Sequence, residues 1–312
     1  MRDDLMTTET STDQAKNIRI GLLLAAFGTG LFAMKSIFIK LAFQEGIDTS
    51  TLLALRMLVA LPFYVGMLFW LLTKQQDRKP IPSLKQWLIV CGLGFLGYYL
   101  ASYLDIEGLN YITAQLERLT LYTYPLITTV LGWLFLKDVI TKRIILALLV
   151  SYAGIMLLYL YEANLEGANV SKGVLLVLGS ALSFSCYIVF SKPFISQLGS
   201  RLFTCIAMIA SAVYAFVHFA MTSHALGDLF SVTSMAWLYV FLLAIVCTVL
   251  PSFMVTEAIS RIGPAKTSIV GTAGPVFTIA LAVLLLDEPF GWYHLAGMLL
   301  VMGGVSLLGK KS

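Results

Sequence analysis

Charged residues are scarce in this sequence. Only 12% of the 312 residues are Asp, Glu, Lys or Arg, whereas 59% are hydrophobic, and a water-soluble domain usually carries about 25% charged residues. This shortage excludes an ordinary soluble protein. Apolar runs recur along the whole chain instead, and a helix needs about 20 such residues to cross a bilayer. We therefore predict an all-α, polytopic membrane protein.

Metal-binding and catalytic patterns are also missing. The three histidines are dispersed, and the four cysteines lie in apolar segments without the spacing of metal ligands. The sequence GLGFLG at 92–97 fits G-x-G-x-x-G, but it lies in an apolar run, where small residues allow neighbouring helices to approach closely. We expect no enzymatic activity, cofactor or metal, and the small net charge of +4 gives no reason to expect nucleic acid as a partner.

Ten apolar runs are separated by polar breaks and predict ten membrane-spanning helices. They cover residues 20–42, 51–72, 87–106, 113–136, 144–161, 173–191, 202–221, 236–256, 267–286 and 295–309. The polar segment 1–18 is of mixed charge and is expected to form a disordered cytoplasmic tail. It is too acidic for the start of a signal peptide, so the first apolar run is expected to remain as a membrane helix.

Lysine and arginine are distributed unevenly between the predicted connections. With the N-terminus placed inside, sixteen of them fall in the inner tails and loops, and only Lys172 falls in an outer loop. Cytoplasmic loops of membrane proteins retain positively charged residues. The distribution predicts a multi-pass protein of the cell (inner) membrane with both termini in the cytoplasm.

The chain contains an internal repeat. A shift of 150 residues aligns 87–158 with 237–308 without a gap and superposes Trp87 on Trp237 and Pro125 on Pro275. The two copies are expected at 19–162 and 172–309, with five spans each. Because five is odd, the copies must cross the membrane in opposite directions. Secondary transporters are often built in this way, with the substrate site between the halves.

Each copy has a proline early in its fourth span, an acidic residue thirteen positions later and glycine in its fifth span. These residues are Pro125, Asp138 and Gly154 in the first copy, and Pro275, Glu288, Gly297, Gly303 and Gly304 in the second. In this pattern the chain resembles the EamA family of the drug/metabolite transporter superfamily. The resemblance implies transport of small metabolites, often amino acids, by alternating access, and it leaves the substrate open.

The Asp, Glu, Lys and Arg residues that are expected inside the spans belong to the first copy. A charge near the centre of a membrane helix costs at least about 2.5–3.5 kcal/mol, so such groups usually face a bundle interior or a watery cavity. The second copy has Thr267 and Ser268 at the positions equivalent to two of them, so the shared scaffold does not require the charges. The five candidate site residues are Lys35, Arg56, Asp105, Glu117 and Arg118.

The surroundings of Glu117 and Arg118 suggest further site residues. Adjacent helical residues point about 100° apart, so these two side chains need different partners. Pro125 cannot donate a backbone hydrogen bond and is expected to loosen its helix, so Pro125 and its equivalent Pro275 are predicted hinges. Candidates for an aromatic part of the site are Tyr122, Tyr124 and Tyr187.

Two interpretations of the charged residues stay open. They form an internal ion-pair network that locks the bundle, or some of them bind the polar head of a substrate or relay a proton. In the second case Arg56 and Arg118 would hold an anionic group, and Lys35 would pair with Glu117 in the empty site.

The sequence therefore predicts a secondary active transporter of small polar or amphipathic metabolites, either amino-acid-like zwitterions or organic anions. It is expected to work by alternating access and to be an exporter. The expected partners are the lipid bilayer, a small-molecule substrate and protons, and the oligomeric state is left open. The alternative is a non-transporting membrane receptor or a lipid-handling scaffold.

Overall fold

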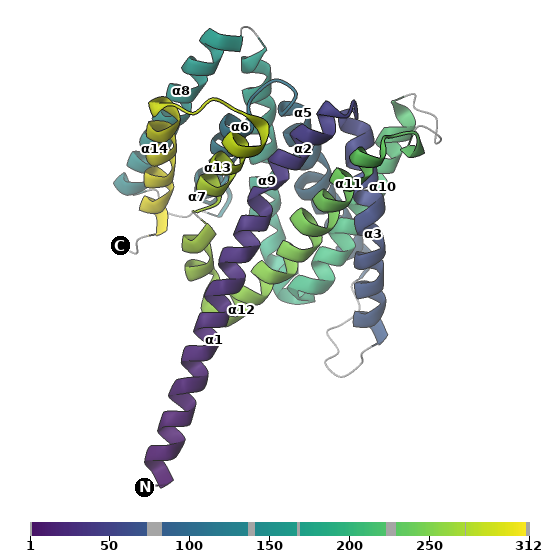
Figure 1. Cartoon of the computed structure of the whole chain (residues 1–312). Helices are drawn as coiled ribbons and strands as arrows, with labels where there is room; N and C mark the ends of the chain where they lie inside the picture. The colour runs from purple at the N-terminus through teal and green to yellow at the C-terminus, as the bar shows by residue number, and fades with distance from the viewer. Residues whose placement is uncertain are drawn as a thin grey trace.

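The computed structural model describes residues 2–73, 83–136, 141–166, 169–222, 229–271 and 273–309. Within these ranges the long regular elements are all helices (Figure 1). The first half contains α1 (Arg2–Ala33), α2 (Lys35–Gln44), α3 (Thr49–Thr73), α4 (Leu84–Gly94), the π-helical η2 (Phe95–Leu100), α5 (Ala101–Gly108), α6 (Ala114–Leu121), α7 (Tyr124–Leu136) and α8 (Lys142–Glu166). The second half contains α9 (Val170–Leu198), α10 (Ser200–Met221), α11 (Ser234–Phe241), the π-helical η4 (Leu242–Val249), α12 (Leu250–Gly271), α13 (Gly274–Leu286) and α14 (Trp292–Gly309).

The bundle has the surface of a membrane protein. Seven of the described helical segments are long and apolar enough to cross a bilayer. Large apolar side chains such as Phe69, Leu175 and Leu284 are exposed, whereas the Asp105 and Glu117 carboxyls are buried. Lipid can cover such an outer surface, while water would penalise it. The chain is a multi-pass, all-α membrane protein, which confirms the prediction from composition.

The predicted spans differ from the helices at three places. The fourth span, 113–136, is divided into α6 and α7, and the first is interrupted at Met34 between α1 and α2. Residues 257–266 were expected to connect the eighth and ninth spans, but they continue α12 to Gly271. An i,i+4 ion pair between Arg261 Nε and Glu257 Oε1, at 2.8 Å, favours helix in that stretch.

The two halves have the same succession of elements. The starts of α4 and α11, at Leu84 and Ser234, are 150 residues apart, and each helix is capped by the hydroxyl of the preceding residue, Ser83 or Thr233. The same offset relates α7 to α13 at both ends and α8 to α14 at the start. Each of these two helices is followed by a π-helical segment, η2 after α4 and η4 after α11. The structure therefore contains the repeat that the sequence predicted.

The halves are packed into one another rather than side by side. α1 packs along α12, α3 along α10, and α8 along α14, while α9 lies against α5 and α7. Gly97 of η2 allows close approach of α9, since a Cβ there would lie 2.3 Å from Tyr187 Cγ. The glycines of GLGFLG thus include one that serves helix packing, as the sequence suggested.

The N-terminal segment differs from its prediction. Residues 1–18 were expected to be disordered, but α1 begins at Arg2 and runs without interruption into the apolar span. Figure 1 shows the beginning of this helix extending away from the bundle. A helix that is already nucleated by its membrane part can be lengthened at little cost, because adding a residue is far easier than starting a new helix.

Candidate functional site

The predicted charged residues meet where three helices of the first half come together. Lys35 is the first residue of α2, Asp105 lies on α5, and Glu117 lies on α6. Lys35 Nζ forms an ion pair with Asp105 Oδ2, and Ser36 Oγ donates a hydrogen bond to Glu117 Oε2. The Asp105 and Glu117 carboxyls also interact with each other as hydrogen-bonding partners. We call Lys35, Ser36, Asp105 and Glu117 the carboxyl cluster.

This pairing corrects one expectation. Lys35 was predicted to pair with Glu117, but its ammonium contacts Asp105 instead. Lys35 and Ser36 are neighbours at the start of α2, and they contact different carboxyl groups. The Lys35 side chain is 17% exposed and that of Asp105 only 1%. The lysine is therefore the more accessible partner of an otherwise buried pair.

Two arginines carry positive charge beside the carboxyl cluster. Arg56 of α3 is 3% exposed and interacts electrostatically with Asp105. Arg118 of α6 interacts with both carboxyl groups, and a Cβ added to Gly274 would lie 3.6 Å from its Nη2 atom. The Nε atoms of both arginines are buried and have no hydrogen-bond partner within the described part of the chain. Buried guanidinium groups with unused donors are prepared to receive an anion.

The second half contributes the other wall of this charged region. The buried Cys247 thiol of η4 interacts electrostatically with Lys35, Arg56 and Arg118. The Ala33 carbonyl at the end of α1 accepts a hydrogen bond of 2.9 Å from Thr278 Oγ1 of α13. A carbonyl freed by a helix break inside a membrane needs such a partner. The break at Met34, which presents Lys35 and Ser36, is thus stabilised by the opposite repeat.

The predicted aromatic residues form a continuous group next to Arg118. Tyr122 and Tyr124 lie at the break between α6 and α7, and their rings are in edge contact. Phe184 links Tyr124 to Tyr187 through an edge contact and a stacked contact. The Tyr187 hydroxyl bonds to that of Tyr98 at 3.0 Å. Both predicted hinge prolines, Pro125 and Pro275, lie at the second residue of a helix that follows such a break.

Two carboxylates cap the start of α6. Glu288, from the connection between α13 and α14, accepts hydrogen bonds from the Ala114 and Gln115 amides at 2.7 and 3.3 Å. Glu162 at the end of α8 accepts bonds from the hydroxyl and the amide of Thr113. Burial raises the pKa of the Glu288 carboxyl, while the Ala114 amide opposes this by favouring the carboxylate. The Glu288 contacts fasten the charged helix α6 to the other repeat, and the Glu162 contacts fasten it to α8.

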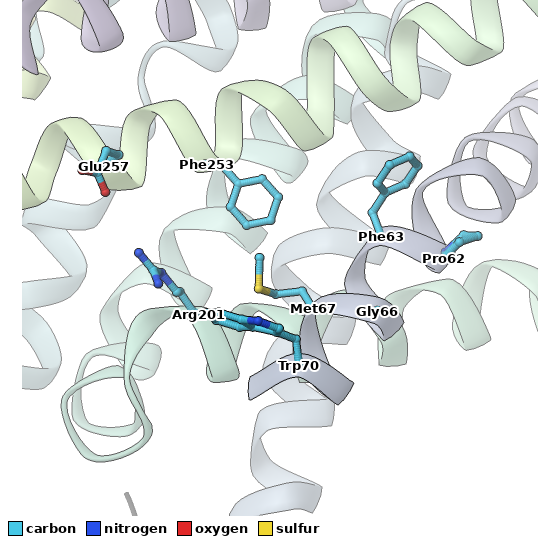
Figure 2. Close-up of a pocket in the computed structure, with 8 residues that line it drawn as sticks. All are labelled: Pro62, Phe63, Gly66, Met67, Trp70, Arg201, Phe253 and Glu257. Atoms are coloured by element: carbon cyan, nitrogen blue, oxygen red, sulfur yellow. The ribbon is translucent and has the colours of Figure 1, made fainter. Parts of the chain in front are cut away.

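A groove opens near the other end of α3. Figure 2 shows it between α3, α10 and α12, with Phe63, Met67, Trp70 and Phe253 around an apolar middle and Arg201 and Glu257 at one side. Its volume is about 770 Å³. Trp70 follows Thr49 by 21 residues, and Thr49 contacts Glu107 close to the capped start of α6. At 1.5 Å per residue the groove lies roughly 30 Å from that end. The groove and the capped start of α6 therefore lie toward opposite ends of α3.

Sequence reasoning found the charges but missed several of their partners. Ser36 was overlooked because a serine in a membrane helix is common, although its place beside Lys35 marks a polar spot. Cys247 is buried, as expected of a cysteine in an apolar segment, but it also interacts electrostatically with Lys35, Arg56 and Arg118. Glu288 was noticed only as part of a family pattern. Among the described residues no group of histidine, cysteine and acidic side chains could hold a metal ion.

Comparisons with known proteins agree with these observations. The model of the EamA-like transporter family matches residues 19–160 and 171–310. The uncharacterized transporter YcbK of Bacillus subtilis (strain 168) is 32% identical over 286 residues, which are 89% of this chain and 88% of that protein. The uncharacterized transporter YetK of the same strain is 24% identical over 82% of this chain and 78% of its own length. A protein crystal structure aligns with a TM-score of 0.61 and 16% identity over 92% of this chain and 96% of that one, and it shows the fold alone.

Proposed function

Because the chain belongs to the EamA-like transporter family, as its sequence pattern indicated, we propose that this membrane transporter moves small metabolites with a carboxylate group by alternating access. The observation that carries the proposal is a pair of arginines beside the carboxyl cluster, the buried Arg56 and the half-buried Arg118, whose Nε atoms are buried and unused as donors. Two guanidinium groups bind a carboxylate with directed, charge-assisted hydrogen bonds. The transporter names of the relatives favour this function over the receptor or scaffold alternative.

The chemistry around the arginines favours zwitterions among the carboxylates. Lys35, Arg56 and Arg118 supply three positive charges, and Asp105 and Glu117 supply two carboxyls within the same region. An amino-acid-like solute would place its carboxylate at the arginines and its amino group at the acids. The group of Tyr122, Tyr124, Phe184 and Tyr187 would face its side chain. The two carboxyl groups therefore favour an amino-acid-like zwitterion over a simple organic anion.

The proposed membrane arrangement has ten crossings in two inverted repeats, at 19–162 and 172–309. In this arrangement α6 and α7 together form the fourth crossing, and both termini lie in the cytoplasm of a bacterial inner membrane. The capped end of α6 then faces outward, and the groove beside Arg201 and Glu257 faces the cytoplasm. With this orientation, we propose that the groove is the inward-facing opening from which a solute enters for export. Protons are the proposed source of energy.

Transport by purified protein in liposomes tests this function. Protein-containing vesicles are loaded with a mixture of labelled proteinogenic amino acids and simple carboxylates. They should release one of these two classes faster than protein-free vesicles with the same load. The Arg118→Ala variant should lower this flux at least about tenfold, because a hydrogen bond to a charged group contributes about 1.5–3 kcal/mol.

A matched control is available in Arg261, which forms an exposed i,i+4 pair with Glu257 away from the carboxyl cluster. The Arg261→Ala variant should retain most of the flux, since exposed pairs contribute about 0.3–0.5 kcal/mol. Unchanged transport by both Arg118→Ala and Glu117→Gln would contradict the assignment of the site. Absence of any flux in the wild type across both solute classes would contradict the function.

A further inference from the structure

The carboxyl groups of Asp105 and Glu117 are held next to each other by two adjacent residues of α2, because Lys35 contacts Asp105 and Ser36 contacts Glu117. Both side chains are at most 1% exposed, and the two carboxyls interact as hydrogen-bonding partners. Ionised carboxylates only accept hydrogen bonds, so one member of such a pair must carry a proton. Asp105 Oδ1 and Glu117 Oε1 receive no bond from any donor in the ranges that the structure describes. A single proton between the groups would satisfy this need.

The neighbouring groups indicate which carboxyl is protonated. The pair is faced by Lys35 from α2, Arg56 from α3 and Arg118 from α6 itself. The Cys247 thiol of η4 interacts with these three cations. Lys35 forms its ion pair with Asp105, whereas Glu117 receives only the neutral hydroxyl of Ser36 among the bonds identified. Asp105 is therefore the ionised member, and Glu117 carries the proton.

We propose that this proton and the amino group of a transported zwitterion compete for the Asp105–Glu117 pair, so that the protein exchanges one proton for one solute molecule. This inference rests on the proposed function and names its coupling site. An ammonium group binds the pair only when both carboxyls are ionised, so its arrival releases the proton from Glu117 to the open groove side. Proton return from the other side would then expel the solute.

Competition predicts that binding of the zwitterion and binding of the proton weaken each other. Reciprocal linkage requires that a zwitterion weakens proton binding by the same factor by which the proton weakens zwitterion binding. An analogue with the carboxylate but no amino group would bind at the arginines without displacing the proton. Inward flow of protons would drive the zwitterion outward, in keeping with export.

Infrared spectroscopy of the purified, solute-free protein tests the shared proton directly. At neutral pH the wild type should show the C=O stretch of a protonated carboxylic acid, and Glu117→Gln should lose it. Glu107→Gln is the matched control, because Glu107 lies two residues from Asp105 and accepts bonds from Thr49 and Tyr111 instead. A wild-type spectrum that Glu117→Gln leaves unchanged would overturn the proposal, whatever the transport measurements show.

Calorimetry tests the competition. Individual L-amino acids, and for each the matching carboxylate without its amino group, are titrated into the protein in buffers of different ionisation enthalpy. Binding of the amino acid should release up to about one proton, and the matching carboxylate should release none. Binding without proton release would overturn the coupling proposal while leaving the transport function intact. Absence of binding together with absence of flux would instead overturn the transport function, and the infrared result would still decide the shared proton.

Discussion

At the scale of single residues, the ion pair of Lys35 and Asp105 shows how a membrane protein keeps charges inside. The Asp105 carboxylate is almost fully buried, and its partner ammonium is only slightly exposed. The desolvation of such a pair is offset by mutual attraction only while both members are present. The buried pair therefore constrains the positions of α2 and α5, and removing one member is more damaging than removing both.

Asp105→Asn is expected to lower the free energy of unfolding by about 3–5 kcal/mol, because it leaves the Lys35 ammonium without its partner. The double variant Lys35→Met with Asp105→Leu should recover most of this loss, since apolar side chains of similar size fill the space without a charge. Unfolding of the purified proteins in detergent measures both effects. A double variant no more stable than Asp105→Asn would show that the two residues do not act as a pair.

At the scale of elements, close approach between α8 and α14 depends on glycines at defined positions. Gly154 of α8 and Gly297 of α14 face one another, so that a Cβ on Gly154 would lie 2.8 Å from the Gly297 carbonyl oxygen. Gly304 lies about two turns after Gly297 on α14 and makes a similarly close approach to α8, at Ser151 and Ala147. In a membrane, helix association relies on such packing because lipid supplies no hydrophobic drive between helices.

Gly304→Ala is expected to lower stability by about 1–3 kcal/mol, because the new Cβ overfills a packed contact. It would lie 2.2 Å from Ser151 Oγ and 2.8 Å from the Ala147 carbonyl oxygen. The adjacent Gly303→Ala is the control, as its Cβ would have no atom within 4 Å. It should be neutral or stabilising by about 0.5–1 kcal/mol. Equal midpoints of thermal unfolding for the two variants would show that α14 is not fixed in this register.

The elements also show what the sequence could and could not predict. The seven helical segments long enough to cross a bilayer follow from apolar length, and the repeat follows from aligned residues, so both were predictable. The predicted number of ten spans stays a prediction. The interruption at Met34 was not, because it depends on Thr278, a residue 244 positions away whose hydroxyl satisfies the freed carbonyl of Ala33. The charged residues of the site could be chosen by their cost in a membrane. Their pairing could not, since the choice of Lys35 between Asp105 and Glu117 is made by three-dimensional geometry.

At the scale of the whole molecule, the capped start of α6 and the groove lie toward opposite ends of α3. Glu288 and Glu162 hold the start of α6. The groove is bounded by α3, α10 and α12. In the proposed alternating access, equivalent elements of the two repeats exchange their roles and give a second state of similar construction. This exchange would require release of the contacts that cap α6.

The bonds from Glu288 are therefore expected to control the balance between the two states. Loss of a helix cap costs about 0.5–2 kcal/mol, so Glu288→Ala should raise the population open at the α6 end by about twofold to thirtyfold. Labelling of the buried position Ala114 by a maleimide reports this opening, with Ala114→Cys placed in a chain whose own cysteines are replaced by alanine. Asp287→Asn is the control, because Asp287 is the exposed residue next to Glu288. Its φ is positive, and asparagine accepts this backbone conformation.

A second reporter distinguishes opening from general loosening. Met67→Cys lies in the groove (Figure 2), and its labelling should slow in Glu288→Ala if the groove closes as the α6 end opens. Faster labelling at both positions would indicate a partly unfolded protein. Unchanged labelling at Ala114→Cys would mean that Glu288 caps α6 without restraining it. Opposite changes at the two ends are the result that rigid-body exchange between inverted repeats requires, because one movement of α6 and its neighbours serves both ends.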